Sequence, residues 1–167
     1  MYMQRPKILL VDDSQAEGIL LDLAFIEARR SVNLIQVCDG EIAWKQLQAA
    51  AKLVPFPFRL IVIDLNLPRF SGLDLLRKLR GWPAVMGVPM VILTTSPSVR
   101  ERGEVKALNV PLLLKPDHYD GLGAVIAEMI PYLFPAEAGL PLEMASEIGR
   151  PRSSNMARIL PKVLPTM

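Results

Sequence analysis

Residues 60–68 read LIVIDLNLP, and this is the most informative stretch of the chain. Its first four residues are continuously apolar, which is typical of a strand buried on both faces of a parallel sheet. Asp64 follows at once, so a carboxylate ends the most hydrophobic stretch of the sequence. Because burying an unpaired carboxylate is costly, we expect Asp64 to have a functional role.

Other apolar runs of strand length lie on both sides of this stretch. The expected strands are 7–11, 34–38, 60–65, 90–93 and 110–114. The segments between them have the apolar spacing of amphipathic helices. Strict alternation of strands and helices predicts a doubly wound α/β domain of (βα)5 architecture. In such domains ligands collect beyond the carboxyl ends of the strands.

The expected helices have identifiable faces and starts. The predicted core-facing residues of the first helix are Ile19, Leu20, Leu23 and Ile26, and those of the third are Leu73, Leu75, Leu76 and Leu79. Three helix starts carry Ser followed three residues later by an acid, the pattern of a capping box. These pairs are Ser14 with Glu17, Ser71 with Asp74, and Ser98 with Glu101.

The composition limits the function classes. The 167 residues are 51% hydrophobic with a formal net charge of +2, which fits one globular domain plus an appendage and favours neither a nucleic-acid nor a membrane partner. A single Cys and a single His exclude an intrachain disulfide and a zinc cluster and fit a cytoplasmic protein. We expect a domain over 5–134 and a basic, proline-rich extension over 135–167, without a separate output domain.

Polar residues follow the other strands at the edge where Asp64 is expected. Asp12 and Asp13 follow the first strand, Thr94 ends the fourth, and Lys115 follows the fifth. Adjacent carboxylates favour a hard divalent cation such as Mg²⁺, although an Asp-Asp-Ser run can equally cap a helix. Together these residues suit phosphoryl transfer, which needs metal ligands, an acceptor carboxylate, a hydroxyl and a cation for the phosphoryl oxygens.

In order and spacing this set resembles the receiver domain of two-component response regulators. The residues that carry the resemblance are Asp12, Asp13, Asp64, Thr94, Lys115 and Pro116. The resemblance implies a flavodoxin-like five-stranded parallel sheet of order 2-1-3-4-5, as in the chemotaxis regulator. It also implies that Asp64 accepts a phosphoryl group from a sensor histidine kinase in a Mg²⁺-dependent reaction. Such a protein is a phosphoacceptor with self-catalysed transfer and autodephosphorylation, not an enzyme with turnover.

The resemblance also implies roles for individual residues. The implied metal ligands are Asp12, Asp13, Asp64 and the backbone carbonyl of Asn66. Thr94 and Lys115 would bind the phosphoryl oxygens, while Asn66 and Ser96 lie where the family tunes dephosphorylation. The peptide bond before Pro116 is a candidate for the cis isomer.

The chain departs from the family pattern at two positions. Leu112 stands where most receivers have an aromatic switch residue, and Thr95 stands where Ala or Gly is common. These departures leave an alternative open, a pseudo-receiver that binds partners without phosphorylation. Gly72, in contrast, fits the glycine that follows the loop after the acceptor.

The loop at 64–72 and the strand end at 93–96 resemble small receivers that serve bacterial and cyanobacterial phytochrome kinases. A bacteriophytochrome histidine kinase is therefore the candidate partner, with output by phosphorylation-dependent protein contact. The last helix, the helix over 98–108 and the fifth strand form the surface on which receivers commonly dimerise, so we expect a homodimer.

Two other protein classes share parts of this pattern. A haloacid-dehalogenase-type phosphatase needs an acid two residues after its nucleophile, but Asn66 follows Asp64 at that distance. A flavodoxin-type electron carrier binds the FMN phosphate after its first strand, where residues 12–18 here read DDSQAEG and would repel it. Both classes are disfavoured.

Overall fold

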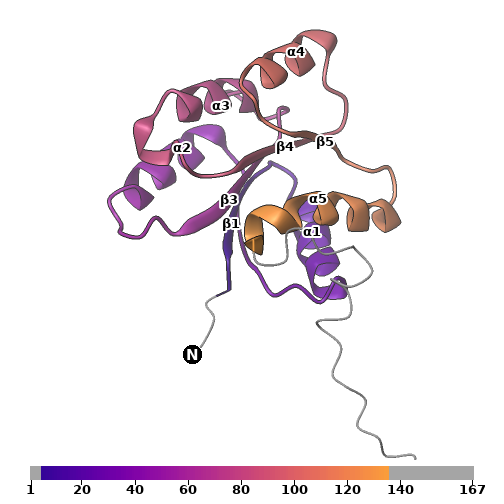
Figure 1. The fold of residues 1–167 in the computed structure, drawn as a ribbon. Helices are drawn as coiled ribbons and strands as arrows, with labels where there is room; N and C mark the ends of the chain where they lie inside the picture. The colour runs from indigo at the N-terminus through magenta and orange to yellow at the C-terminus, as the bar shows by residue number, and fades with distance from the viewer. Residues whose placement is uncertain (1–4, 136–167) are drawn as a thin grey trace, which may run out of the picture.

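The computed structural model describes residues 5–135, which form one parallel sheet between two layers of helices (Figure 1). The five strands run in the order β2-β1-β3-β4-β5. The strands are β1 (Lys7–Val11), β2 (Asn33–Val37), β3 (Phe58–Ile63), β4 (Met90–Thr94) and β5 (Leu112–Leu114). The helices are α1 (Gln15–Glu27), α2 (Gly40–Ala50), α3 (Gly72–Arg80), α4 (Val99–Ala107) and α5 (Leu122–Leu133), with 3-10 turns at Pro83–Val85 and Tyr119–Gly121. The predicted fold class and strand order are confirmed.

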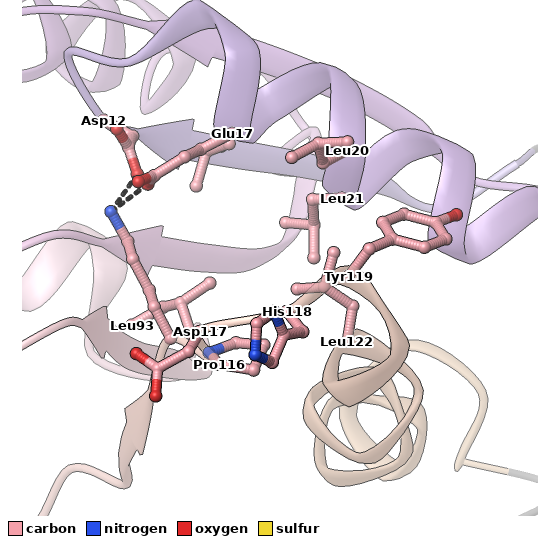
Figure 2. A pocket seen from close by; sticks show the side chains of 12 residues that line it. Asp12, Glu17, Leu20, Leu21, Leu93, Pro116, Asp117, His118, Tyr119 and Leu122 are labelled. Atoms are coloured by element: carbon pink, nitrogen blue, oxygen red, sulfur yellow. Dashed lines mark hydrogen bonds and ion pairs between the residues drawn. The ribbon is translucent and has the colours of Figure 1, made fainter.

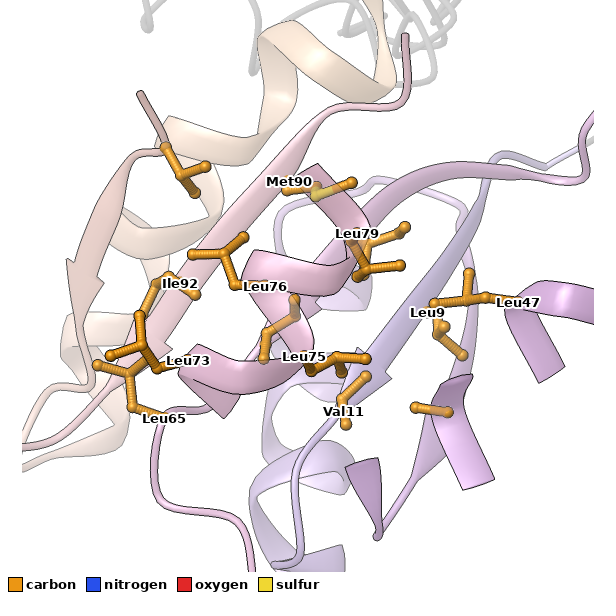
Figure 3. Close-up of a cluster of buried hydrophobic side chains, with 14 of the residues drawn as sticks. Leu9, Val11, Leu47, Leu65, Leu73, Leu75, Leu76, Leu79, Met90 and Ile92 are labelled. Atoms are coloured by element: carbon orange, nitrogen blue, oxygen red, sulfur yellow. The ribbon is translucent and has the colours of Figure 1, made fainter. Parts of the chain in front are cut away.

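The central strands are buried on both faces because successive side chains point to opposite sides of the sheet. In β1, Leu9 and Val11 join the apolar cluster under α2, α3 and α4, whereas Ile8 and Leu10 join the cluster under α1 and α5. Figure 3 shows the first cluster, in which Leu76 of α3 is fully buried. The apolar face predicted for α3 is confirmed.

The apolar face predicted for α1 is wrong. Ile19 and Ile26 are each 62% exposed, and Leu20 and Leu23 are exposed as well. The face that meets the sheet instead carries Gly18, Leu21, Ala24 and Phe25. Because α1 is apolar on both faces, its periodicity alone does not select one. The sheet buries the face with the bulky Phe25 and the small Gly18, which lies directly against the Gln36 side chain.

The predicted capping residues begin three of the helices. Ser98 and Glu101 form the full reciprocal capping box at α4. Ser14 and Ser71 each accept one backbone N–H of their helix, which satisfies an otherwise free donor. The side chain of Glu17 turns away from the cap of α1 to another partner.

The predicted extension over 135–167 lies, apart from Pro135, outside the described residues. Across residues 5–135, none of the helices combines the length and the hydrophobicity that a membrane span requires.

Candidate functional site

The register of the sheet brings two carboxylates together. Val11 at the end of β1 pairs with Ile63 at the end of β3, so the next residues, Asp12 and Asp64, lie side by side. The backbone N–H of Asp64 donates to the Val11 carbonyl at 2.9 Å, which fixes this alignment. The acid that ends the most hydrophobic stretch of the sequence therefore has a second acid as its neighbour.

The strands β4 and β5 add a hydroxyl and a cation to the same edge. The backbone N–H of Lys115 donates to the Thr94 carbonyl at 2.8 Å. Thr94 is fully buried, and its Oγ1 accepts a hydrogen bond from Asn66 Nδ2 at 3.3 Å. The Asn66 backbone N–H in turn donates to Asp64 Oδ1 at 3.1 Å. Asn66 thus links the Asp64 carboxylate to the Thr94 hydroxyl.

The Lys115 ammonium lies at the centre of the acidic group. Its Nζ donates to Asp12 Oδ2 and to Asp64 Oδ2, both at 2.7 Å, and also contacts Glu17 Oε2. The Asp12 and Asp64 side chains are 2% and 6% exposed, whereas that of Glu17 is 39% exposed. Glu17 therefore forms the solvent side of this ion-pair cluster.

Burial and ion pairing shift the protonation of two groups in the cluster. Burial raises the pKa of Asp12 to about 6, against the lowering effect of its hydrogen bonds from Lys115 and Ser14. Burial by itself lowers the pKa of Lys115, but hydrogen bonds to Asp12, Asp64 and Glu17 outweigh it and raise that pKa above its ordinary value. Lys115 is therefore a permanent cation at neutral pH.

The acid set fits a divalent cation. Asp12, Glu17 and Asp64 each offer a carboxylate oxygen, and these oxygens lie within 4.8 Å of one another. Hard divalent cations prefer such oxygen ligands. The predicted ligand Asp13 is exposed and does not belong to this group, so its part in metal binding stays a prediction.

Glu17 is the functional candidate that the sequence reasoning missed. The spacing of Ser14 and Glu17 predicts a capping box, and we therefore assigned Glu17 to helix capping and not to the site. It lies in the first turn after β1, and helical side chains lean toward the helix N-terminus. This general lean toward the carboxyl edge was the one signal in the sequence that could have indicated Glu17.

The other residues singled out in the sequence lie outside the hydrogen-bonded cluster around Lys115. Ser96 and Thr95 are exposed beyond the end of β4. Leu112 is partly buried and packs against the core under α3 and α4. The predicted cis bond before Pro116 is wrong, because the only cis peptide bond within residues 5–135 precedes Pro55. The Lys115–Pro116 bond adopts the trans isomer, which X–Pro bonds favour by about 0.5–1 kcal/mol.

A pocket of about 160 Å³ opens beside the cluster, between α1 and the segment that leads into α5. Figure 2 shows Asp12 and Glu17 at one end of it. Its other end is apolar, with Leu21 of α1 facing Leu122 of α5. The pocket therefore joins the charged edge to an apolar groove.

Gly72 sets the position of the loop that follows Asp64. Its N–H donates to the Leu65 carbonyl at 3.1 Å. A Cβ on Gly72 would lie 1.9 Å from the carbonyl oxygen of Asp64, which is far inside van der Waals contact. The start of α3 can approach the Asp64 backbone this closely only with glycine at this position.

With this geometry in place, comparison with known proteins identifies the family. The sequence profile of the response regulator receiver domain matches residues 8–122. The chain belongs to this family. The family comprises signalling proteins, and the aligned strand ends of this receiver carry the polar residues described above.

Individual relatives are similar over most of the receiver. Response regulator Rcp1 of Synechocystis sp. (strain ATCC 27184 / PCC 6803 / Kazusa) is 36% identical to this chain over 91 residues. The aligned region spans 53% of this chain and 61% of Rcp1, so it covers less than two thirds of the length of Rcp1. The Mn²⁺-bound structure of Rcp1 has a TM-score of 0.66 at 29% identity, covering 77% of this chain and 95% of that one. RPA3017, a response regulator in red light signaling of R. palustris, has a TM-score of 0.66 at 25% identity, covering 77% and 94%.

A further structural likeness concerns the fold alone. The phosphorylated cyanobacterial phytochrome response regulator RcpA has a TM-score of 0.69 and covers 79% of this chain and 96% of its own. At 24% sequence identity, this likeness shows that the two proteins share the arrangement of strands and helices.

Proposed function

We propose that this receiver accepts a phosphoryl group on Asp64 from a sensor histidine kinase and signals through the resulting aspartyl phosphate. The observation that carries the proposal is the convergence of Lys115 on two buried carboxylates, with its Nζ 2.7 Å from both Asp12 and Asp64. A permanent cation at the acceptor oxygen is suited to an incoming group whose oxygens are negatively charged.

The transfer step follows from this arrangement. An Asp64 carboxylate oxygen attacks the phosphorus atom, and the bond from phosphorus to the kinase imidazole nitrogen breaks with its electron pair left on that nitrogen. Lys115 and the Thr94 hydroxyl bind the phosphoryl oxygens. The Thr94 hydroxyl donates its proton to a phosphoryl oxygen, and its Oγ1 can still accept the hydrogen bond from Asn66 Nδ2.

The proposed cofactor is Mg²⁺, held by Asp12, Asp13, Asp64 and the backbone carbonyl of Asn66. The clustered carboxylates fit such a cation, and the Mn²⁺-bound structure of Rcp1 supports divalent binding in a relative. When bound, Mg²⁺ supplies positive charge opposite the phosphoryl oxygens. Asn66 and Ser96 are proposed to tune dephosphorylation. Both are exposed, and the Asn66 backbone N–H contacts Asp64 Oδ1.

The wider organisation is part of the same proposal. The receiver spans 5–134, is cytoplasmic, and pairs with a bacteriophytochrome kinase, which the relative in red light signaling supports. It forms a homodimer through α4, β5 and α5, where the edge strand β5 leaves Leu114 47% exposed. With Leu112 in place of an aromatic switch residue, the signal passes through this surface by repacking of apolar side chains.

Acetyl phosphate labelling tests the proposal. Wild type incubated with acetyl phosphate and Mg²⁺ is expected to gain one phosphoryl group by intact mass, and Asp64→Asn is expected to gain none. The gain should require Mg²⁺ and should disappear with EDTA. If wild type remains unlabelled both here and with a cognate kinase, the phosphoacceptor role is wrong and a phosphorylation-independent binding module takes its place.

A further inference from the structure

Glu17 differs from the other two partners of the Lys115 ammonium. Asp12 and Asp64 are buried and are among the proposed metal ligands, so a bound cation would compete with Lys115 Nζ for these two carboxylates. Glu17 lies on the solvent side, where its carboxylate remains available to the ammonium. Glu17 belongs to the acidic group that could hold a cation but lies outside the ligand set proposed above. With Asp12 and Asp64 engaged by a cation, Glu17 would be the anionic partner left to Lys115 among residues 5–135.

The start of α1 holds Glu17 in place. The Gln36 side-chain amide donates to the carbonyls of Asp12 and Ser14, both at 2.9 Å. Gly18 packs against this amide so closely that a Cβ would lie 2.0 Å from Gln36 Oε1. The first turn of α1 is therefore fixed against β2, and Glu17 projects from a rigid position.

We propose that Glu17 is a positioning residue, which holds the Lys115 ammonium at the phosphoryl position when a divalent cation occupies Asp12 and Asp64. The inference rests on the proposed function and adds a residue to it. Without Glu17, repulsion by the cation drives the ammonium away from the site toward solvent. Lys115 then reaches the incoming phosphoryl oxygens less often.

Other roles for Glu17 predict different results. If its carboxylate only repels the phosphoryl donor, neutralising it accelerates labelling, because one negative charge is lost. If it is a metal ligand, neutralising it raises the Mg²⁺ concentration needed for half-maximal labelling whether or not Lys115 is present. If it only stabilises α1, the labelling rate of the folded protein does not change.

The first experiment measures labelling by acetyl phosphate at saturating Mg²⁺ in the full chain. We expect Glu17→Gln to slow the maximal rate about fivefold, as for loss of one partly exposed charge-assisted hydrogen bond. In a Lys115→Met background the same change should not slow labelling further. Asp22→Asn removes another acid of α1 and serves as the matched control, with an unchanged rate. An unchanged or faster rate in Glu17→Gln overturns the proposal, as does an equal slowing in both backgrounds.

The second experiment reads the position of Lys115 directly. The protein is acetylated with a water-soluble succinimidyl ester with and without Mg²⁺, and Lys115 modification is compared by peptide mass spectrometry with that of exposed Lys45. Mg²⁺ should raise Lys115 acetylation about fivefold in Glu17→Gln and less than about twofold in wild type. If Mg²⁺ changes Lys115 acetylation by the same factor in Glu17→Gln and in wild type, the proposal is overturned. Because wild type must label in the first experiment for the rates to be compared, failure of the proposed function is distinguished from failure of the Glu17 role.

Discussion

The carboxyl edge of the sheet and the interior beneath α3 both contain deeply buried side chains but differ in what holds these side chains together. Beneath α3, Leu75, Leu76 and Leu79 are fully buried, and any well-fitting apolar neighbour satisfies them. At the edge, Asp12 and Thr94 are as deeply buried, but each needs a particular partner. The interior therefore depends on shape and apolar contact, whereas the edge depends on specific hydrogen bonds and ion pairs.

The largest effect on stability should come from the interior. Leu76→Ala removes a fully buried side chain and leaves a cavity, so the free energy of unfolding should fall by roughly 3–5 kcal/mol in urea denaturation. The fraction that remains folded should still label with acetyl phosphate at the wild-type rate. A labelling rate per folded molecule that falls with stability would show that the two regions are not separable.

A smaller loss is expected when the edge loses its cation. Lys115→Met leaves the carboxylates of Asp12, Glu17 and Asp64 together without their ammonium, and should lower the free energy of unfolding by about 3 kcal/mol in EDTA. Added Mg²⁺ should stabilise Lys115→Met more than it stabilises wild type or Leu76→Ala, because only Lys115→Met has carboxylates that lack their ammonium. Equal stability of Lys115→Met and wild type in EDTA would contradict the view that the edge depends on specific partners.

The smallest effect is a pH dependence that belongs to Asp12. Its pKa is raised to about 6 in the folded protein, above the value of an unfolded chain, so the folded state holds the proton more tightly. Protonated Asp12 therefore contributes to the free energy of unfolding below about pH 4, and this contribution is lost as the pH rises toward 6. In EDTA, wild type should lose on the order of 2 kcal/mol across this window relative to Asp12→Asn. Parallel pH profiles for the two proteins would show that burial does not set the proton affinity of Asp12.

The sequence predicted the interior well because its signal is repeated in all five strands and in α3. Five apolar runs and the leucine spacing of α3 all agree with one sheet covered on both faces. For α1 the same reasoning chose the wrong face, because Leu23 and Phe25 lie on opposite sides of an equally apolar helix. Only the packing against the sheet distinguishes them.

At the edge, the sequence predicted which residues would meet but not how they pair. Asp12, Asp64, Thr94 and Lys115 do converge, because the strand ends are aligned by the register. That Glu17 joins them depends on a side-chain direction, which residue spacing does not specify. The isomer of a single peptide bond, before Pro116, is likewise a local choice between two states of similar energy.

The contact between Gly72 and the carbonyl of Asp64 has a genetic consequence. Every missense change in the Gly72 codon adds at least a Cβ, and that atom has no room 1.9 Å from a carbonyl oxygen. Codons for surface residues such as Glu41 can drift through many amino acids. For as long as selection maintains the acceptor, the Gly72 codon should vary only among its synonymous forms.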